Sequence, residues 1–270
     1  MSMERIKQAV QRARQDEQNI AEIPLPSAKQ QSSLPYSGKI SYTQTRVVKP
    51  SPTVLKRNRL ILGEDNKSIT TPYKILRTQV LQRLVSNCWN SLAVTSPRSG
   101  EGKTLTAINL AISLANEVNH TVLLIDLDLH RPSVHKYFGF EVEWGLSDYL
   151  LRDKPLQNIL LNPGADRLVI LPGHTSIENS SELLSSPKMV QLVEELKTRY
   201  PSRLLIFDLP PLLSTDDAIA FSPYVDAALV VIEEGKTKKE ELKQTIDLLQ
   251  GINILGTVLN KSVARKQDYY

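Results

Sequence analysis

The chain has 270 residues, of which 41% are hydrophobic and 23% charged, a composition typical of a soluble globular protein and unlike collagen or a wholly disordered chain. Its single cysteine, Cys88, excludes an internal disulfide bond, no signal peptide opens the sequence and every apolar run is too short to cross a bilayer, so we expect a cytoplasmic protein. Residues 1–70 hold 12 Lys and Arg against 6 Asp and Glu, so the net charge of +4 arises in the N-terminal part.

The first predicted region is a flexible basic arm, residues 1–59. Residues 3–23 are compatible with a short helix, and the stretch that follows is rich in Pro, Ser and Gln but too poor in large apolar residues to fold alone. The positive charge of the arm has two interpretations. It attracts anionic lipid or an acidic partner, or it is ordinary solubilising charge.

The second predicted region, residues 60–262, alternates apolar strands with amphipathic helices. Strands are predicted at 91–96, 121–127, 167–173, 203–209, 227–234 and 253–260, and helices at 71–85, 103–118, 187–200 and 238–251. Continuous Leu, Val and Ile in the strands indicates a mainly parallel sheet that is buried on both faces. We therefore predict a three-layer α/β domain, whose ligands bind beyond the carboxyl ends of the strands.

The segment TSPRSGEGKT, Thr95–Thr104, lies between a predicted strand and a predicted helix. Such a loop directs its backbone N–H groups and the positive end of the helix at one point, which suits a polyphosphate. Lysine at the end of the loop reaches the terminal phosphates, and the next hydroxyl is available to Mg²⁺. The residues predicted to bind nucleotide here are Ser99, Gly100, Glu101, Gly102, Lys103, Thr104 and Leu105.

Two residues of this loop are unusual for a phosphate-binding loop. Pro97 lacks an N–H, but it precedes the amides that cradle phosphate, so nucleotide binding is expected to survive. Arg98 has two interpretations, a guanidinium that contacts phosphate or a solvated charge on the shoulder of the loop.

Acidic residues follow two of the predicted strands. Asp126 and Asp128 lie at the end of strand 121–127 with Arg131 close behind, and Asp208 lies near the end of strand 203–209. Buried strands do not end in carboxylates without a compensating cation, and Mg²⁺ with a bound phosphate supplies one. The alternative is that Asp126 and Asp128 pair only with Arg131 or Lys103.

Three segments together, TSPRSGEGKT, LLIDLDLHRPS and LLIFDLPP, resemble the nucleotide motifs of the bacterial tyrosine kinases, the autokinases of capsule and exopolysaccharide synthesis. The resemblance runs from about residue 73 to residue 270, and is especially close to the separate cytoplasmic kinases of exosortase-linked loci. It implies a P-loop NTPase fold and transfer of the ATP γ-phosphate to tyrosines in a C-terminal tail, usually that of a neighbouring subunit in a ring.

The resemblance also implies roles for single residues. Lys103 would neutralise phosphate oxygens, Thr104 would bind Mg²⁺, and Asp208 would hold the metal directly or through water. Either Asp126 or Asp128 would bind metal or accept the hydroxyl proton, and the sequence does not divide these two roles. The resulting catalytic candidates are Lys103, Asp126, Asp128 and Asp208, the metal candidates are Thr104, Asp126 and Asp208, and the further nucleotide-binding candidates are Arg131 and Asn260. Asn260 is alternatively a strand-end turn residue.

The third predicted region is the tail, residues 263–270, which ends in Tyr269 and Tyr270. These tyrosines are interpreted as phosphoacceptors or as a frayed terminus. Ring assembly in the family uses a Glu-x-x-Arg-x-x-Arg helix, which here becomes Thr71, Lys74 and Arg77. The ring contact is therefore an open question, since Lys74 and Arg77 equally suit a solvated helix face.

The resemblance implies partners as well. These are a homo-oligomer, an inner-membrane polysaccharide chain-length protein that activates the kinase and places it at the membrane, and a cognate tyrosine phosphatase. No basic groove suggests nucleic acid. Two other functions compete with the kinase: a ParA/MinD-like positioning ATPase, which normally carries lysine where Arg98 stands, and a non-catalytic nucleotide-gated regulator of a polysaccharide synthase.

Overall fold

The computed structural model describes residues 45–64, 66–200 and 202–262. Most of the predicted basic arm and the predicted tail, with Tyr269 and Tyr270, lie outside these residues, so the predictions for them remain predictions. Among the described residues, no helix has the length and apolar character that a membrane crossing requires.

The described residues form one eight-stranded sheet with the order β1-β4-β5-β3-β6-β2-β7-β8. All neighbouring strands are parallel except β4 and β5, which are antiparallel. The strands are β1 (Arg46–Val47), β2 (Ser91–Thr95), β3 (Thr121–Asp126), β4 (Leu161–Asn162), β5 (Leu168–Leu171), β6 (Arg203–Asp208), β7 (Ala227–Glu233) and β8 (Asn253–Asn260).

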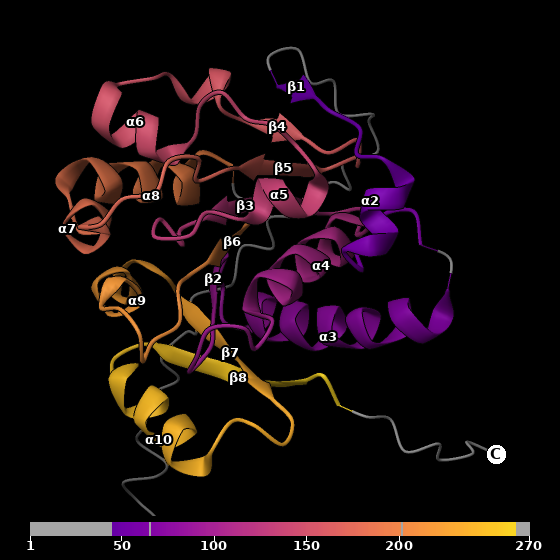
Figure 1. The fold of residues 1–270 in the computed structure, drawn as a ribbon, viewed down its shortest axis with the longest axis vertical. Helices are drawn as coiled ribbons and strands as arrows, with labels where there is room; N and C mark the ends of the chain where they lie inside the picture. Colours follow the sequence, from indigo (N-terminus) through magenta and orange to yellow (C-terminus); the bar gives the residue numbers. More distant parts are fainter. Residues whose placement is uncertain (1–44, 65, 201, 263–270) are drawn as a thin grey trace, which may run out of the picture. The chain divides into compact units, whose positions relative to one another are not determined.

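Helices cover both faces of this sheet (Figure 1). They are α2 (Pro52–Arg57), α3 (Lys67–Ser86), α4 (Lys103–Ala115), α5 (Val134–Phe138), α6 (Leu146–Arg152), α7 (Ser180–Leu184), α8 (Pro187–Arg199), α9 (Asp217–Phe221) and α10 (Lys239–Leu248), with short 3-10 helices η1 (Leu156–Asn158) and η2 (Ser222–Tyr224). One hydrophobic core lies between the sheet and α3, α4 and α5, and a second lies under α6 to α10. The alternating side chains of the buried strands supply both cores, which is why these strands are apolar throughout.

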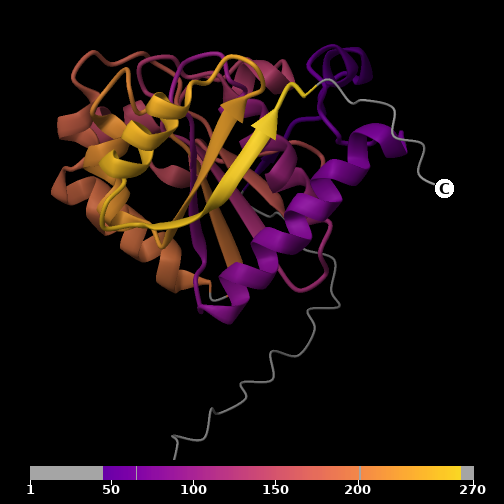
Figure 2. The same cartoon turned by 90° about the horizontal axis from the view of Figure 1, so that it is seen from below.

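The predicted fold is confirmed: the structure is a three-layer domain with a mainly parallel sheet, and each of the six predicted strands is present. The two-residue strands β1 and β4 were not predicted, nor were α5 and α6 in the segment that appeared only polar. Helix α3 begins at Lys67, four residues before the predicted start at 71, because the Asn66 side chain caps it by accepting a hydrogen bond from the Ser68 N–H. Figure 2 shows α3 running beside β8, the edge strand.

The folded part also extends upstream of the predicted boundary at Leu60. Strand β1 pairs with β4, and Leu60 and Ile61 are buried in the first core. The side chain of Asn109, on α4, fastens this segment by accepting from the Ile61 N–H at 3.0 Å and donating to the Arg59 carbonyl at 3.0 Å. Residues 45–59 therefore form part of the domain, because partners far along the chain supply the contacts that this segment lacks on its own.

Candidate active site

The carboxyl ends of β2, β3 and β6 meet at one edge of the sheet. In the register of these parallel strands Asp126 lies opposite Asp208, and Asp208 lies opposite Val94 on its other side. The segment that follows β2 is the phosphate loop. The strand order, with β6 between β2 and β3, therefore brings the loop and the acids of two separate motifs together.

The phosphate loop, residues 96–102, turns directly into α4. Gly100 and Gly102 have φ values of +86° and +94°, a left-handed conformation that glycine adopts without strain. A Cβ added to Gly102 would lie 2.0 Å from Nδ2 of Asn260, so any larger residue would have to displace the Asn260 side chain as well as adopt a strained left-handed backbone. Helix α4 begins at Lys103, and the unpaired N–H groups of its first turn give this end a partial positive charge.

Lys103 is buried and sits among oxygen atoms. Its Nζ lies 2.7 Å from Oδ2 of Asp128, 3.6 Å from Oδ1 of Asp208 and 3.3 Å from Oγ1 of Thr104. Burial alone would lower the pKa of Lys103, but the charges of Asp208 and Asp128 outweigh it and raise the pKa. Lys103 is therefore a fixed cation at the N-terminus of α4, next to the phosphate loop.

Asp208 and Thr104 form the second contact of the centre. The Thr104 hydroxyl donates to Oδ2 of Asp208 at 2.7 Å, while Oδ1 of Asp208 is buried and receives no hydrogen bond from the described residues. Burial raises the pKa of Asp208, against the opposing pull of Lys103 and of the Thr104 hydroxyl. Oδ1 of this carboxylate thus has no hydrogen bond of its own and faces the Lys103 ammonium at 3.6 Å.

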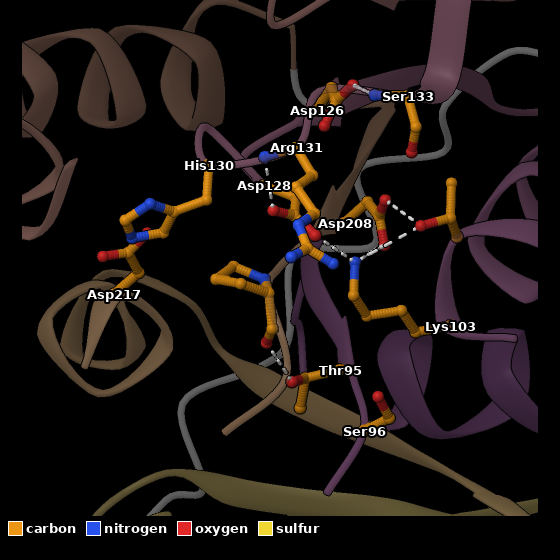
Figure 3. A network of polar contacts seen from close by, with 12 residues as sticks. Thr95, Ser96, Lys103, Asp126, Asp128, His130, Arg131, Ser133, Asp208 and Asp217 are labelled. Carbon is orange, nitrogen blue, oxygen red and sulfur yellow. Dashed lines mark hydrogen bonds and ion pairs between the residues drawn. The ribbon is translucent and has the colours of Figure 1, made fainter. Parts of the chain in front are cut away.

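Asp126 is held from the other side of the centre. Its Oδ2 accepts hydrogen bonds from the N–H groups of Ser133 at 2.9 Å and Val134 at 3.0 Å, and Oδ1 is buried without a partner among the described residues. Burial, with the nearby charge of Asp208, raises the pKa of Asp126 to about 7. In Figure 3, Lys103, Asp128 and Asp208 point toward one another, while Asp126 points toward Ser133.

The remaining predicted residues lie around this centre. The N–H of Arg131 donates to Oδ1 of Asp128 at 3.1 Å, and its side chain is exposed. Asn260, at the end of β8, donates from Nδ2 to the Glu101 carbonyl at 2.8 Å and so touches the phosphate loop. Ser99 is exposed at the tip of the loop, whereas Glu101 is buried.

Two alternatives from the sequence have different outcomes in the structure. The Arg98 guanidinium forms an ion pair with Glu241 of α10 and its side chain is 62% exposed, as expected of a solvated charge on the shoulder of the loop, while a contact with phosphate stays a prediction. Asp128 does pair with Lys103, as one alternative held. On α3, Arg77 pairs with Glu117 at 3.0 Å inside its own chain, and Lys74 is exposed.

These side chains fit a nucleotide with Mg²⁺. Asp126 and Asp208 each keep a buried carboxylate oxygen that receives no hydrogen bond from the described residues, and Lys103 is the cation nearest to that of Asp208, at 3.6 Å. Buried carboxylates of this kind are costly unless further positive charge joins them. No group of three or more His, Cys, Asp or Glu within residues 45–64, 66–200 and 202–262 would hold a metal by itself. This suits Mg²⁺, which binds through one or two carboxylates and completes its shell with water and substrate phosphates.

The sequence did not predict Thr237 and Lys261, which form hydrogen bonds to the phosphate loop. The Glu101 side chain, the Thr237 hydroxyl after β7 and the Lys261 ammonium after β8 form hydrogen bonds across more than a hundred residues of sequence. A threonine and a lysine in polar turns carry no periodic signal. Only the conjunction of a buried glutamate in the loop with a distant hydroxyl identifies them.

Known proteins share this fold and these motifs. Residues 92–269 match the family described as CobQ/CobB/MinD/ParA nucleotide binding domain. The chain is 32% identical over 218 residues to tyrosine-protein kinase YwqD of Bacillus subtilis (strain 168), covering 80% of this chain and 91% of that protein. It is 30% identical over 218 residues to tyrosine-protein kinase Etk of Escherichia coli (strain K12), where it spans 79% of this chain but 30% of the longer relative.

Solved structures agree with this picture. The kinase domain of Escherichia coli Etk superimposes with a TM-score of 0.71 and 28% identity, covering 83% of this chain and 91% of that domain. The septum site-determining protein MinD of Pyrococcus horikoshii, complexed with Mg-ADP, superimposes with a TM-score of 0.54 and 25% identity over 63% of this chain and 69% of that one. The kinase domain therefore matches a larger part of this chain than the MinD protein does.

Proposed function

We propose, on the premise that this chain belongs to the bacterial tyrosine-protein kinases of the CobQ/CobB/MinD/ParA nucleotide-binding family, that it transfers the γ-phosphate of ATP to tyrosine hydroxyls. The observation that supports this most directly is the contact of Lys103 with Asp128 and Asp208 at the start of α4. A buried cation beside unsatisfied carboxylates is suited to a bound triphosphate with its metal.

In the proposed reaction the phenolic oxygen forms a bond to the γ-phosphorus and the bond from that phosphorus to the β,γ-bridging oxygen breaks. ADP leaves, and the phenolic proton passes to a carboxylate or to water. Mg²⁺, when bound, neutralises charge on the phosphate oxygens. The protein contributes mainly position and fixed charge.

Each residue has a role that follows from its place. Lys103 neutralises terminal phosphate oxygens, and the N–H groups of the phosphate loop and the first turn of α4 cradle them. Thr104 and Asp208, already bonded to each other, hold the metal. Asp126, whose pKa of about 7 suits proton exchange near neutral pH, accepts the phenolic proton or binds metal. Asp128 holds Lys103 in place.

Outside the described residues, Tyr269 and Tyr270 are the proposed acceptors, presented to a neighbouring copy. The proposed setting is exopolysaccharide or capsule synthesis, with an inner-membrane chain-length protein as activator and a tyrosine phosphatase as antagonist. These proposals rest on the family resemblance, since the names of the relatives identify kinases and not the polymers they regulate.

The test incubates the purified chain with Mg²⁺ and γ-labelled ATP and locates the label by mass spectrometry. Label on Tyr269 or Tyr270 is expected, and Lys103→Met is expected to remove it, while Lys243→Met on the exposed face of α10 keeps it. Replacing Tyr269 and Tyr270 together by Phe should abolish most labelling and leave ATP binding intact, with Tyr200→Phe as the control for an exposed tyrosine.

Other outcomes point to the competing functions. Release of free phosphate without protein label would favour the ATPase switch, for which the MinD likeness is the supporting observation. ATP binding with neither product would favour a nucleotide-gated regulator. Undiminished label in the double Phe variant would place the acceptor elsewhere in the chain.

A further inference from the structure

We infer that Thr237 and Lys261 are positioning residues that hold the phosphate loop in its nucleotide-binding shape. They act on the loop through Glu101 and Gly100, from a part of the chain that follows the loop by more than 130 residues. The inference rests on the ATP-binding part of the proposed function and adds residues that the phosphate-loop motif itself does not contain.

The Glu101 side chain forms a hydrogen bond within the phosphate loop itself. It is only 4% exposed, and its Oε2 accepts a hydrogen bond from the Arg98 N–H at 2.9 Å. The carboxylate therefore closes the loop on itself, from Glu101, its second-last residue, back to Arg98, its third. A buried carboxylate that satisfied only one oxygen would be costly, so its other oxygen needs a partner of its own.

Thr237 supplies that partner. Its hydroxyl donates to Oε1 of Glu101 at 2.5 Å and accepts from the Glu233 N–H at 2.8 Å, so the hydroxyl is fixed by the end of β7. The Thr237 hydroxyl thus links the Glu101 side chain of the loop to the end of strand β7. No substitution without a donor at this position preserves that arrangement.

Lys261 provides a second attachment, which is anchored on Glu233 as that of Thr237 is. Its Nζ donates to the Gly100 carbonyl at 2.7 Å and pairs with Oε2 of Glu233 at 2.8 Å. Lys261 also has a φ of +57°, a left-handed conformation that costs energy for a residue with a side chain. Strain of this kind persists where surrounding contacts hold it, and here those contacts lead to the phosphate loop.

The need for outside support follows from the conformation of the loop. Gly100 and Gly102 are both left-handed, and a loop rich in glycine has more unfolded conformations to lose than one built of other residues. The N–H groups that would contact phosphate are useful only if they point at one place before the nucleotide arrives. Thr237 and Lys261 fix the two sides of this segment, and Asn260 contacts the Glu101 carbonyl between them.

The test compares Thr237→Val with Thr237→Ser in the full chain. Valine keeps the shape and removes the hydroxyl, whereas serine keeps the hydroxyl. We expect Thr237→Val to raise the Kd for ATP with Mg²⁺, measured by calorimetry, and the KM for ATP by about tenfold each, with kcat within about twofold of wild type. Thr237→Ser should restore both values to near wild type.

Lys261 gives the same test at a largely exposed site, where folding is not at risk. Lys261→Met is expected to raise the Kd for ATP by several-fold, and Lys261→Arg to restore it, since both replacements share the left-handed backbone. Thermal unfolding of every variant is measured alongside, so that a change in affinity is compared between chains that are equally folded.

The inference would be overturned if Thr237→Val bound ATP with the same Kd as wild type, or if Thr237→Ser bound ATP as weakly as Thr237→Val. It would also be overturned if Thr237→Val lowered kcat and left the KM for ATP unchanged. Because calorimetry requires no phosphoryl transfer, failure of tyrosine labelling in the wild type would defeat the proposed kinase and leave this inference standing. A wild type that fails to bind ATP would defeat both.

Discussion

Carboxylates at the two ends of the parallel sheet are built in opposite ways. Asp226, at the amino end just before β7, is half-buried and has every oxygen engaged: it accepts from the Asn90 N–H at 3.0 Å, the Ser91 N–H at 3.0 Å and the Ser91 hydroxyl at 2.7 Å, and pairs with Lys197 at 2.6 Å. Burial would raise the pKa of Asp226, but the bonds from Lys197 and Ser91 outweigh it and lower the pKa.

At the carboxyl end, Asp126 and Asp208 are fully buried, and in each one oxygen receives no hydrogen bond from the described part of the chain. Burial raises the pKa of both. The contrast separates two uses of the same side chain. Asp226 has its hydrogen bonds supplied by the protein, as expected of a carboxylate that stabilises the fold, whereas Asp126 and Asp208 lack some of theirs, as expected of the ligand-binding role proposed for them.

The largest expected effect on activity comes from Asp208→Asn, which removes a negative charge at the carboxyl end of the strands. We expect tyrosine phosphorylation to fall by about 10²–10³-fold, because a fixed charge that offsets the phosphate and metal is lost. The free energy of unfolding should not fall, since the variant no longer buries a charge. Kinetic assays with denaturant unfolding check both. A variant with full activity would remove Asp208 from the centre.

The second prediction concerns pH. An acid whose pKa is raised in the folded state stabilises the fold below its unfolded pKa, and that stability is lost as pH rises through the folded value. With a folded pKa of about 7, Asp126 makes the nucleotide-free protein less stable between about pH 4 and pH 7, by up to ~1.4 kcal/mol per pH unit. Asp126→Asn should reduce this slope. Unfolding in EDTA at several pH values measures it, and parallel curves for both proteins would contradict the assignment.

The smallest effect on activity is expected from a change at the amino end of the strands, where Asp226 lies. Asp226→Asn should lower the free energy of unfolding by about 2 kcal/mol, since hydrogen bonds to a charged acceptor and an ion pair are weakened. Activity per folded molecule should stay unchanged, because Asp226 lies at the opposite end of the strands. Here the pH dependence reverses: the stability that Asp226 supplies is lost as pH falls below the usual Asp value. If the folded fraction of Asp226→Asn lost activity, the distinction between a structural carboxylate at the amino end and functional carboxylates at the carboxyl end would be wrong.

The fold was predictable where strands are buried on both faces, because an uninterrupted apolar run such as that of β3 or β6 has few alternatives. Short elements were not predictable. Strand β1 has two residues, and its identity depends on β4, more than a hundred residues away. Helix α5 follows Pro132 and Ser133 and helix α6 follows Gly145, residues that are typical of a loop until packing against the cores is known.

In the candidate site, the residues of the phosphate loop and the three acids were predictable, since each motif sits at the end of a strand that the sequence already indicates. Their pairing was not. That Asp128 and not Asp126 contacts Lys103 depends on where β3 ends, because the chain turns after Asp126 and the rule that alternate strand residues share a face no longer applies. The bond from Thr237 to Glu101 spans 136 residues of sequence and leaves no local trace.

The contact of Lys261 with Gly100 has a geometric consequence for assembly. The chain leaves β8 beside its own phosphate loop, and Tyr270 follows Lys261 by nine positions in the sequence. A fully extended chain of that length reaches about 30 Å. If Tyr269 and Tyr270 are the acceptors proposed above, the catalytic centre that receives them must lie within about 30 Å of Lys261, which limits how far apart neighbouring copies can stand.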